Sequence, residues 1–534
     1  MKNYSNLFTA LLGSLLLWVA WPPLVFTILI FVAWVPLLIV EQNTTNWKKF
    51  FGLSFLSLLV WNILTTWWIW NSSEVGAVAA VLFNSFLMSI PFLLMHFTKK
   101  KFGKILGYTS LIIYWMAFEY LHHTWELSWP WLTLGNSFAL HPEWIQWYEY
   151  TGTSGGSLWI LLSNIFYFTI RTEYKNNGRS IGYFKNLLCW FALLIIPILI
   201  SKWISTHEQK LVDLQKATAT KNIVLVQPNV DPWDVKFESG TLESQINKLI
   251  TLSELQIDDS TSLIVWPETA IAAGVWEDQI KTEPAYYPVW SFLNRHPQLS
   301  LLSGIDSYRN YGSNQANASS TARYNKNYGF YYDAYNTAAL FNSDTSINLY
   351  HKGKLVPGVE TLPSFLNWMG PLFEDFGGIS GTLGTDKQRI VFTDKQNHYK
   401  AAPIICYESV YGDYVTEYVR KGANILTIIT NDGWWGNTDG YKQHMNYARL
   451  RAIETRKWVV RSANTGISCF IDPLGNVIYP QPWDKAAAIK LNVPVNDQLT
   501  FFVKHGDLLS RFMAAISLLL LISTMAVSIK KRFL

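Results

Sequence analysis

Three apolar segments of the sequence each lead to a side chain that can take part in covalent catalysis. One segment ends at Glu268, a second ends at Cys406, and Lys352 lies just before a third. Short apolar runs are typical of buried strands. Ligand sites form at the strand ends of open α/β sheets because several loops converge there. The pattern therefore predicts a site in which these three side chains meet.

The three residue types suit acyl-group chemistry through a cysteine. A thiol is a useful nucleophile only as the thiolate, so Cys406 needs a base or a positive neighbour. Glu268 can take the thiol proton if burial raises the pKa of its carboxylate. Lys352 can stabilise both the thiolate and the oxyanion on an attacked carbonyl. Taken singly, these residues also fit a buried cysteine, a strand-end carboxylate and a surface lysine, but their order along the chain favours catalysis.

The composition indicates one part in a membrane and one part in water. Half of the 534 residues are apolar and 15% are charged, which is too apolar for an ordinary soluble protein and too mixed for membrane helices alone. The net charge of +5 is too small to favour nucleic acid as a partner. No metal-ligand spacing and no glycine-rich phosphate loop is found in the sequence, so we expect no metal and no cofactor.

The cysteines indicate no disulfide framework, because three are too few in a chain of this length. Cys189 lies in an apolar run and is expected to be a small buried hydrophobe. Cys406 and Cys469 both fall in the part expected to lie in water, and a pairing between them in an oxidising compartment stays open.

Eight runs of the sequence are apolar enough to be membrane spans, which need about 20 mostly apolar residues. They cover residues 7–20, 24–40, 50–70, 76–97, 105–121, 156–170, 187–201 and 508–528. The first run is short and follows Lys2, as in a signal peptide, but no small-residue cleavage site follows it. We therefore interpret it as a span, which predicts a helical membrane domain over 1–204 with seven spans and a last span within 508–534.

The connecting loops predict the orientation of these spans. Alternate loops and the C-terminal tail carry the basic residues, for example Lys48, Lys99, Arg171 and Lys530, whereas residues 105–170 contain no Lys or Arg. Cytoplasmic loops are the basic ones. Both termini are therefore expected in the cytoplasm, and residues 205–507 on the outer, periplasmic side of a bacterial inner membrane.

One outer loop, residues 122–150, is rich in tryptophan. It contains Trp125, Trp129, Trp131, Trp144 and Trp147. Such clusters are typical of aromatic belts at the headgroup level, and they also suit a wall for lipid chains. Both interpretations stay open.

Between the last two spans the pattern changes to that of an α/β domain. Runs rich in β-branched and apolar residues recur, and helical patterns intervene, which predicts a sheet covered by helices. The expected strands are 222–227, 262–266, 300–304, 338–341, 403–407 and 425–430, and the expected helices are 242–255 and 443–461. The Asn-, Ser- and Tyr-rich stretch 307–336 is interpreted as a surface loop.

The motifs around the three reactive residues resemble the Glu-Lys-Cys triad of the nitrilase superfamily. They are Trp266-Pro267-Glu268, Lys352 and Ile405-Cys406-Tyr407-Glu408, followed by the runs 430–436, 443–444 and 451–456. Together with the spans and the Trp129-Pro130-Trp131 segment, they resemble the membrane branch of that superfamily, the apolipoprotein N-acyltransferases, over almost the whole chain. This resemblance implies an α-β-β-α sandwich for 205–507.

The resemblance also implies residue roles. Glu268 matches the general base, Lys352 the oxyanion-stabilising cation and Cys406 the nucleophile that becomes a thioester. Supporting positions are matched by Glu360, which orients the lysine or shares the proton work, and by Asn336, Tyr407 and Glu408. His444 is expected to have a structural role.

Two positions depart from the family pattern. Gly358-Val359 stands where the family has Phe-Gly, and Phe237 stands where it has tryptophan. Both changes affect loop shape or lipid contacts.

Trp434 and Trp435 follow a strand end, where they fit either a mobile cover over bound lipid or ordinary loop packing.

The implied activity is a two-step acyl transfer. Cys406 takes an acyl chain from a membrane phospholipid, and the α-amine of a diacylated apolipoprotein then takes it from the thioester; the protein is expected to be a monomer. One alternative is a membrane-tethered amidase that uses the same triad with water as acceptor. A second, a transporter or scaffold without catalysis, is disfavoured because the spans contain almost no ionisable residues.

Overall fold

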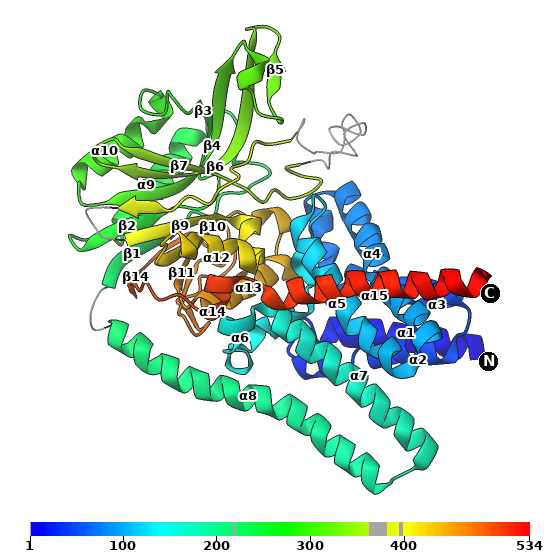
Figure 1. The fold of residues 1–534 in the computed structure, drawn as a ribbon. Coiled ribbons are helices and arrows are strands. Elements are labelled where there is room, and N and C mark those ends of the chain that lie inside the picture. Colours follow the sequence, from blue (N-terminus) through cyan, green and yellow to red (C-terminus); the bar gives the residue numbers. More distant parts are fainter. Residues whose placement is uncertain (1, 217–219, 362–381, 395–398, 534) are drawn as a thin grey trace. The chain divides into compact units, whose positions relative to one another are not determined.

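The computed structural model describes residues 2–216, 220–361, 382–394 and 399–533. The chain divides into two compact units (Figure 1). One consists of Met1–Trp70, Glu74–Ser205 and His505–Leu534, and the other of Asn71–Ser73 and Thr206–Lys504. We refer to them as the helical unit and the sandwich unit.

The described residues of the helical unit form helices joined by turns and short loops. Its main helices are α1 (Lys2–Val19), α2 (Val35–Asn43), α3 (Trp47–Thr66), α4 (Glu74–Phe102), α5 (Lys104–Thr124), α7 (Thr153–Asn177), α8 (Ile181–Lys216), which continues past the unit boundary, and α15 (Leu508–Phe533). Four apolar segments of the described residues are long enough to cross a membrane: Trp47–Asn71, Glu74–Phe102, Ile181–Leu214 and Leu508–Val527. Four of the eight expected spans thus qualify by length and composition, and the other four stay predictions.

The expected span at 24–40 is not one continuous helix. A short 3-10 helix, η1 (Thr27–Phe31), precedes α2, whose first turn contains Pro36. Proline is accommodated there because N–H groups of a first turn have no partner within the helix. Backbone groups near the break are bound by α7 instead: Asn164 Oδ1 accepts from the Trp34 N–H at 2.8 Å, and Asn164 Nδ2 donates to the Ile30 carbonyl at 2.9 Å. Apolar composition alone does not reveal such a side-chain partner.

Tryptophans form much of the core of the helical unit. Trp34 packs edge-on against Trp115, with ring centroids 4.6 Å apart, and against Trp61 at 6.0 Å. Trp131 is fully buried against Trp68, at 4.9 Å. Aromatic pairs of this geometry add to the free energy of burial. Trp131 is therefore a packing residue of its own unit.

The sandwich unit contains two sheets. The first has eight strands in the order β14-β1-β2-β4-β6-β5, with β3 on β4 and β7 on β6. Its strands are β1 (Thr220–Gln227), β2 (Thr261–Val265), β3 (Ile271–Trp276), β4 (Ser300–Gly312), β5 (Arg323–Asn325), β6 (Phe330–Asn342), β7 (Ile347–His351) and β14 (Ala487–Pro494). The second has six, in the order β13-β12-β11-β10-β9-β8. They are β8 (Phe392–Asp394), β9 (Tyr399–Ile405), β10 (Ile425–Thr430), β11 (Trp458–Ala463), β12 (Cys469–Ile471) and β13 (Val477–Ile478).

Helices cover the outer face of each sheet, which confirms the expected α-β-β-α sandwich (Figure 1). Helices α9 (Leu242–Glu254) and α10 (Tyr287–Arg295) bury apolar side chains such as Leu249 and Phe292 against the first sheet. Helices α12 (Gly412–Arg420) and α13 (Asp439–Thr455) pack on the second. The two sheets face each other through β1 and β11, where Ser462 Oγ donates to the Val226 carbonyl at 2.8 Å.

The stretch 307–336 is not a surface loop along its whole length. Strands β4 and β6 pair antiparallel from Ser300 opposite Asn342 to Gly312 opposite Tyr331, and β5 pairs with the far end of β6. Figure 1 shows this pair extending beyond the rest of its sheet as an arm. Tyrosine favours strands because its ring packs across them, and here Tyr308 packs on Trp276 at 5.5 Å. The many Asn and Ser residues obscured this pattern.

The strand registers bring the reactive residues together. Strands β9 and β10 run parallel, with Ile405 opposite Ile429, so Cys406 and Thr430 emerge side by side at the same sheet edge. Strands β6 and β7 run antiparallel, with Thr337 opposite His351, which places Lys352 beside Asn336.

Candidate active site

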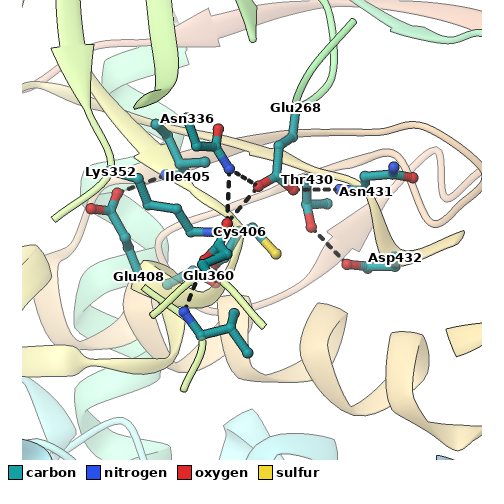
Figure 2. Close-up of polar contacts among 12 residues, drawn as sticks. Glu268, Asn336, Lys352, Glu360, Ile405, Cys406, Glu408, Thr430, Asn431 and Asp432 are labelled. Carbon is teal, nitrogen blue, oxygen red and sulfur yellow. Dashed lines mark hydrogen bonds and ion pairs between the residues drawn. The ribbon is translucent and has the colours of Figure 1, made fainter. Parts of the chain in front are cut away.

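Glu268, Lys352 and Glu360 form one buried ionic cluster beside Cys406 (Figure 2). The Lys352 ammonium donates to Glu360 Oε1 at 2.8 Å and to Glu268 Oε1 at 3.1 Å. Lys352 is 1% exposed, Glu268 6% and Cys406 8%. The structure thus brings together the three residues that the sequence singled out, and it places Glu360, to which the resemblance gave a supporting role, on the lysine as well.

Three further groups orient Glu268. Asn336 Nδ2 donates to Oε1 at 2.7 Å, and the Asn431 backbone N–H donates to Oε2 at 2.9 Å. Lys236 Nζ binds the Glu268 backbone carbonyl at 3.1 Å. The glutamate also needs a glycine beneath it, because a Cβ on Gly304 would lie 2.6 Å from the Glu268 Cα. Asn336 additionally donates to Glu360 Oε1 at 3.1 Å, so one amide links both carboxylates.

The ionisation of Glu268 differs from the expectation. Burial by itself raises the pKa of Glu268, as expected. The charge of Lys352 and the hydrogen bond from Asn336 outweigh burial, so the pKa of Glu268 is lowered below its ordinary value. The carboxylate is therefore ionised in the resting site, and it is a weaker base than the expectation required.

The pKa values of Cys406 and Lys352 are raised, whereas the pKa of Glu268 is lowered. Burial and the charge of Glu268 raise the pKa of the Cys406 thiol, and the charge of Lys352 opposes that rise. Burial disfavours the charged form of Lys352, but Glu268 and Glu360 outweigh this and raise its pKa. The resting site consequently holds a neutral thiol, an ionised Glu268 and a charged lysine.

Cys406 sits at a strained turn between β9 and the short 3-10 helix η9 (Cys406–Val410). Its φ is +48°, in the left-handed region that residues other than glycine rarely adopt. Strain of this kind persists only where the surroundings over-determine it. The Cys406 carbonyl accepts from Ser409 Oγ at 2.8 Å and contacts His444 Nε2 at 3.2 Å, which holds the turn.

Glu408 ties the cysteine strand to the lysine strand. Its Oε2 accepts from the Ile405 N–H at 2.8 Å, and its Oε1 accepts from the Gly353 N–H at 2.7 Å (Figure 2 shows the first of these). Two tyrosine hydroxyls, Tyr350 and Tyr414, each donate to Oε1 at 2.6 Å. Because Ile405 precedes Cys406 and Gly353 follows Lys352, this fully buried carboxylate sets the distance between nucleophile and cation.

The aromatic residues proposed for lipid contact are placed differently from one another. Phe237 is 55% exposed and stacks on Trp434, with ring centroids 6.1 Å apart. Trp435 packs edge-on against His444 at 5.6 Å. Trp129 stacks on Trp131 within the helical unit at 5.5 Å. Phe237 is therefore exposed, whereas Trp434, Trp435 and Trp129 are half-buried and Trp131 is buried.

Tyr407, the residue after the nucleophile, is also buried. Its ring packs edge-on against Tyr411 at 5.2 Å, and burial with the neighbouring Tyr411 raises its pKa. Its position fits packing beneath the nucleophile turn.

Sequence reasoning left Thr430 and Asp432 without a role and treated His444 as structural. The structure places all three beside Cys406. Thr430 Oγ1 donates to Asp432 Oδ1 at 2.6 Å, and His444 Nδ1 binds the same oxygen at 2.9 Å. The run 430–436 and the pair 443–444 marked these segments in the sequence, but the pattern does not reveal contacts between segments.

The ligand-type atoms of Cys406, Asp432 and His444 lie within 4.8 Å of one another. Cation binding there is opposed by Arg461, whose guanidinium binds Asp432 Oδ2. Both ring nitrogens of His444 already have partners in Asp432 and Ser409. Asp432 and His444 thus form a hydrogen-bonded support of the Cys406 backbone. In the described residues all three cysteines are free, and Cys189, expected to be buried, is exposed on α8.

The sandwich fold and the buried Glu-Lys-Cys cluster define the class of protein. Residues 223–496 match the carbon-nitrogen hydrolase family, and the chain belongs to that family. Residues 13–166 match the apolipoprotein N-acyltransferase N-terminal domain. The resemblance drawn from the motifs is therefore confirmed in both parts of the chain.

Several apolipoprotein N-acyltransferases are similar to this chain over most of its length and of their own. The apolipoprotein N-acyltransferase of Chlorobaculum tepidum is 28% identical over 514 residues, covering 94% of this chain and 93% of that protein. The apolipoprotein N-acyltransferase of Rickettsia typhi is 27% identical and covers 82% of each. Apolipoprotein N-acyltransferase 2 of Treponema denticola is 26% identical, covering 84% of this chain and 83% of that protein.

Proposed function

We propose that this protein is an apolipoprotein N-acyltransferase that transfers an acyl chain from a membrane phospholipid to the α-amine of a diacylated apolipoprotein. The observation that carries the proposal is the buried cluster of Glu268, Lys352 and Cys406 in a chain that also has long apolar helices. The similarity to apolipoprotein N-acyltransferases along both units supports it.

In the first half-reaction Cys406 is acylated. Glu268 takes the thiol proton as the sulfur attacks the ester carbonyl of the phospholipid, and the charge of Lys352 stabilises the resulting oxyanion. The carbon–oxygen bond to the glycerol then breaks. The leaving alkoxide takes the proton from Glu268, which releases a lysophospholipid and leaves a thioester on Cys406.

In the second half-reaction the acceptor amine replaces the sulfur. The neutral α-amine attacks the thioester carbonyl, Lys352 again stabilises the oxyanion, and Glu268 takes the amine proton. The carbon–sulfur bond breaks, an amide forms, and Cys406 recovers its proton from Glu268. Glu360 holds the lysine in place during both halves through its 2.8 Å contact.

The membrane location follows from the substrates of the proposed reaction. Both are anchored in a bilayer, so a soluble enzyme would have to extract them. The positive-inside pattern of Lys48, Lys99 and Arg171 supports cytoplasmic termini and a periplasmic sandwich unit. The exposed ring of Phe237, stacked on the half-buried Trp434, is proposed to contact acyl chains.

The donor half-reaction is tested by intact mass spectrometry after incubation with phospholipid alone. We expect a mass increase of one acyl chain, mapped to Cys406 and removed by hydroxylamine. The variant Cys406→Ala is the matched control, because it removes the thiol and nothing else. Wild-type protein that gains no acyl mass would refute the thioester.

The acceptor half-reaction separates a transferase from a hydrolase with the same triad. With phospholipid and a diacylated lipopeptide, the transferase produces an N-acylated lipopeptide and lysophospholipid. Free fatty acid as the sole acyl product would show that water is the acceptor and would overturn the proposal.

A further inference from the structure

His351, the residue before Lys352, lies between two carboxylates that have no part in the proposed reaction. It ends β7 and is 2% exposed. Its Nε2 lies 2.6 Å from Glu277 Oε1, and its Nδ1 lies 3.1 Å from Asp386 Oδ1. Glu277 follows β3, and Asp386 lies in the segment 382–394. Three distant parts of the sandwich unit therefore meet at one imidazole ring.

The protonation state of His351 follows from counting protons. A neutral imidazole has one N–H group and one lone pair, so beside two carboxylates its lone pair must face one of them. An imidazolium donates from both nitrogens. Both ring nitrogens of His351 face carboxylate oxygens, so the geometry favours the charged form. Burial opposes that form, but Asp386 and Glu277 outweigh burial and raise the pKa of His351 above its ordinary value of 6.5.

The charges that face His351 balance when its ring is protonated. Arg309 on β4 donates to Glu277 Oε2 at 2.9 Å, which gives the cluster two cations and two anions. On β6, the ring of Tyr335 packs on the imidazole with centroids 3.9 Å apart, and the Arg309 guanidinium lies 5.5 Å from the centre of the same tyrosine ring. Without the proton on His351, two carboxylates would share one half-exposed arginine.

The same cluster holds the backbone that carries Lys352. The His351 N–H donates to Asp386 Oδ2 at 3.0 Å, and the Lys352 N–H donates to the Asn336 carbonyl at 2.9 Å. The amide of Asn336 is the group that links both carboxylates of the buried ionic cluster. The end of β7 at which Lys352 leaves toward the nucleophile is therefore fixed on one side by His351 and on the other by Asn336.

We propose that His351 is a positioning residue for Lys352: as a charged imidazolium it clamps the end of β7 between Glu277 and Asp386. The clamp stabilises the fold fully below about pH 6.5, the pKa of an unfolded histidine, and is lost as the pH rises through the raised pKa of the folded protein. This inference rests on the proposed role of Lys352 in acyl transfer. It requires a positive charge at position 351 and not only a side chain of that size.

The test compares His351→Gln, which removes the charge, with the double variant His351→Gln/Asp386→Asn, which removes the anion as well. The control is His296→Gln at the end of α10, a half-buried histidine of the same unit. Two quantities are measured on the full chain in detergent, without phospholipid, from about pH 5 to about pH 9. They are the midpoint of thermal unfolding and the rate at which iodoacetamide alkylates Cys406, located by peptide mass.

We expect His351→Gln to lower the midpoint by roughly 5 °C at about pH 6, because two buried carboxylates lose a cation. The gap from wild type should close as the pH rises, since the wild-type ring then loses its own charge. At about pH 6 the alkylation of Cys406 should be about threefold slower, because a displaced Lys352 stabilises the thiolate less.

The double variant should recover about half of the lost midpoint, since it removes the unbalanced charge. Its asparagine oxygen can still accept from the backbone N–H of residue 351. His296→Gln should match wild type in both measurements.

Two results would overturn the inference. A gap between wild type and His351→Gln that is the same at every pH would show that the ring is not a cation; if that variant does not fold, the double variant serves in the same comparison. Alkylation of Cys406 at the wild-type rate or faster would show that His351 stabilises the fold without positioning Lys352. Neither measurement needs lipid, so the role of His351 is decided even if phospholipid acylates no variant and the proposed function fails.

Discussion

The substitution Glu408→Gln tests whether the distance between nucleophile and cation is set by one buried carboxylate. Glu408 accepts four hydrogen bonds, from the backbone N–H groups of Ile405 and Gly353 and from two tyrosine hydroxyls. A glutamine has a single acceptor oxygen. In either orientation of its amide, one of the two backbone N–H groups faces an NH₂ group and loses its acceptor.

The expected cost follows from these contacts. A buried donor without an acceptor costs about 1–3 kcal/mol, and the remaining bonds lose their charge assistance, which adds about 1 kcal/mol. We therefore expect Glu408→Gln to destabilise the sandwich unit by about 2–4 kcal/mol. A loosened link between the strands misplaces Cys406 against Lys352, and a displacement of about 1 Å can cost about 100-fold in rate.

The assay pairs thermal unfolding of the full chain in detergent with the rate of acyl-enzyme formation, each compared with Tyr414→Phe. That control removes one of the four hydrogen bonds and leaves the carboxylate and both backbone contacts, so about 1 kcal/mol and a few-fold change in rate are expected. If Glu408→Gln costs no more than Tyr414→Phe in stability and in rate, the reasoning is refuted.

Three further predictions concern the ionic cluster. Lys352→Met leaves Glu268 and Glu360 buried without their cation, so we expect no acyl-enzyme and a loss of about 3–5 kcal/mol in unfolding free energy; an unchanged denaturation midpoint would contradict this. Asn336→Asp places a third carboxylate beside those two and should slow acylation more than Asn336→Ala does, measured as the initial rate of thioester formation. Because Lys352 and Asn336 hold the pKa of Glu268 below its ordinary value of 4.5, Glu268 stays ionised down to that value and stabilises the fold above it. Acylation should accordingly show no acid limb from Glu268 between about pH 7 and about pH 5, and loss of the acylation rate over that range would show that burial dominates instead.

Much of the site could be predicted from local patterns. Glu268 and Cys406 each follow a short apolar run, and both runs are buried strands in the structure, β2 and β9. A short apolar run predicts a buried strand whatever that strand packs against, so these two strands could be predicted without knowing their neighbours. The same logic failed at 307–336, where Tyr308 and Trp276 stabilise an arm whose polar composition is typical of a loop. Cross-strand packing decides such strands, and the partner strand is not visible in a local window.

The helical unit shows the same limit. The apolar run 24–40 was long enough to predict one span, yet η1 and α2 divide it, and Asn164 binds backbone groups at Ile30 and Trp34. The partner lies 130 residues from Trp34 in the sequence. The length of an apolar run predicts that its side chains avoid water. A break in a helix depends instead on which groups form hydrogen bonds with the backbone N–H and C=O groups that the break leaves free.

The sequence by itself determined the chemistry of this protein: a thiol, a carboxylate and an ammonium group at strand ends, in a chain with long apolar segments. Tertiary structure decided the pKa values and the hydrogen-bond partners of those groups. It lowered the pKa of Glu268 through Lys352, whereas burial alone would have raised it. It also placed Asp432 and His444 beside Cys406, and it linked the strands that carry Cys406 and Lys352 through Glu408. The physical reason is that pKa values and hydrogen bonds depend on distances of a few ångströms, and only the folded chain sets those distances between residues as far apart in sequence as Glu268 and Asn431.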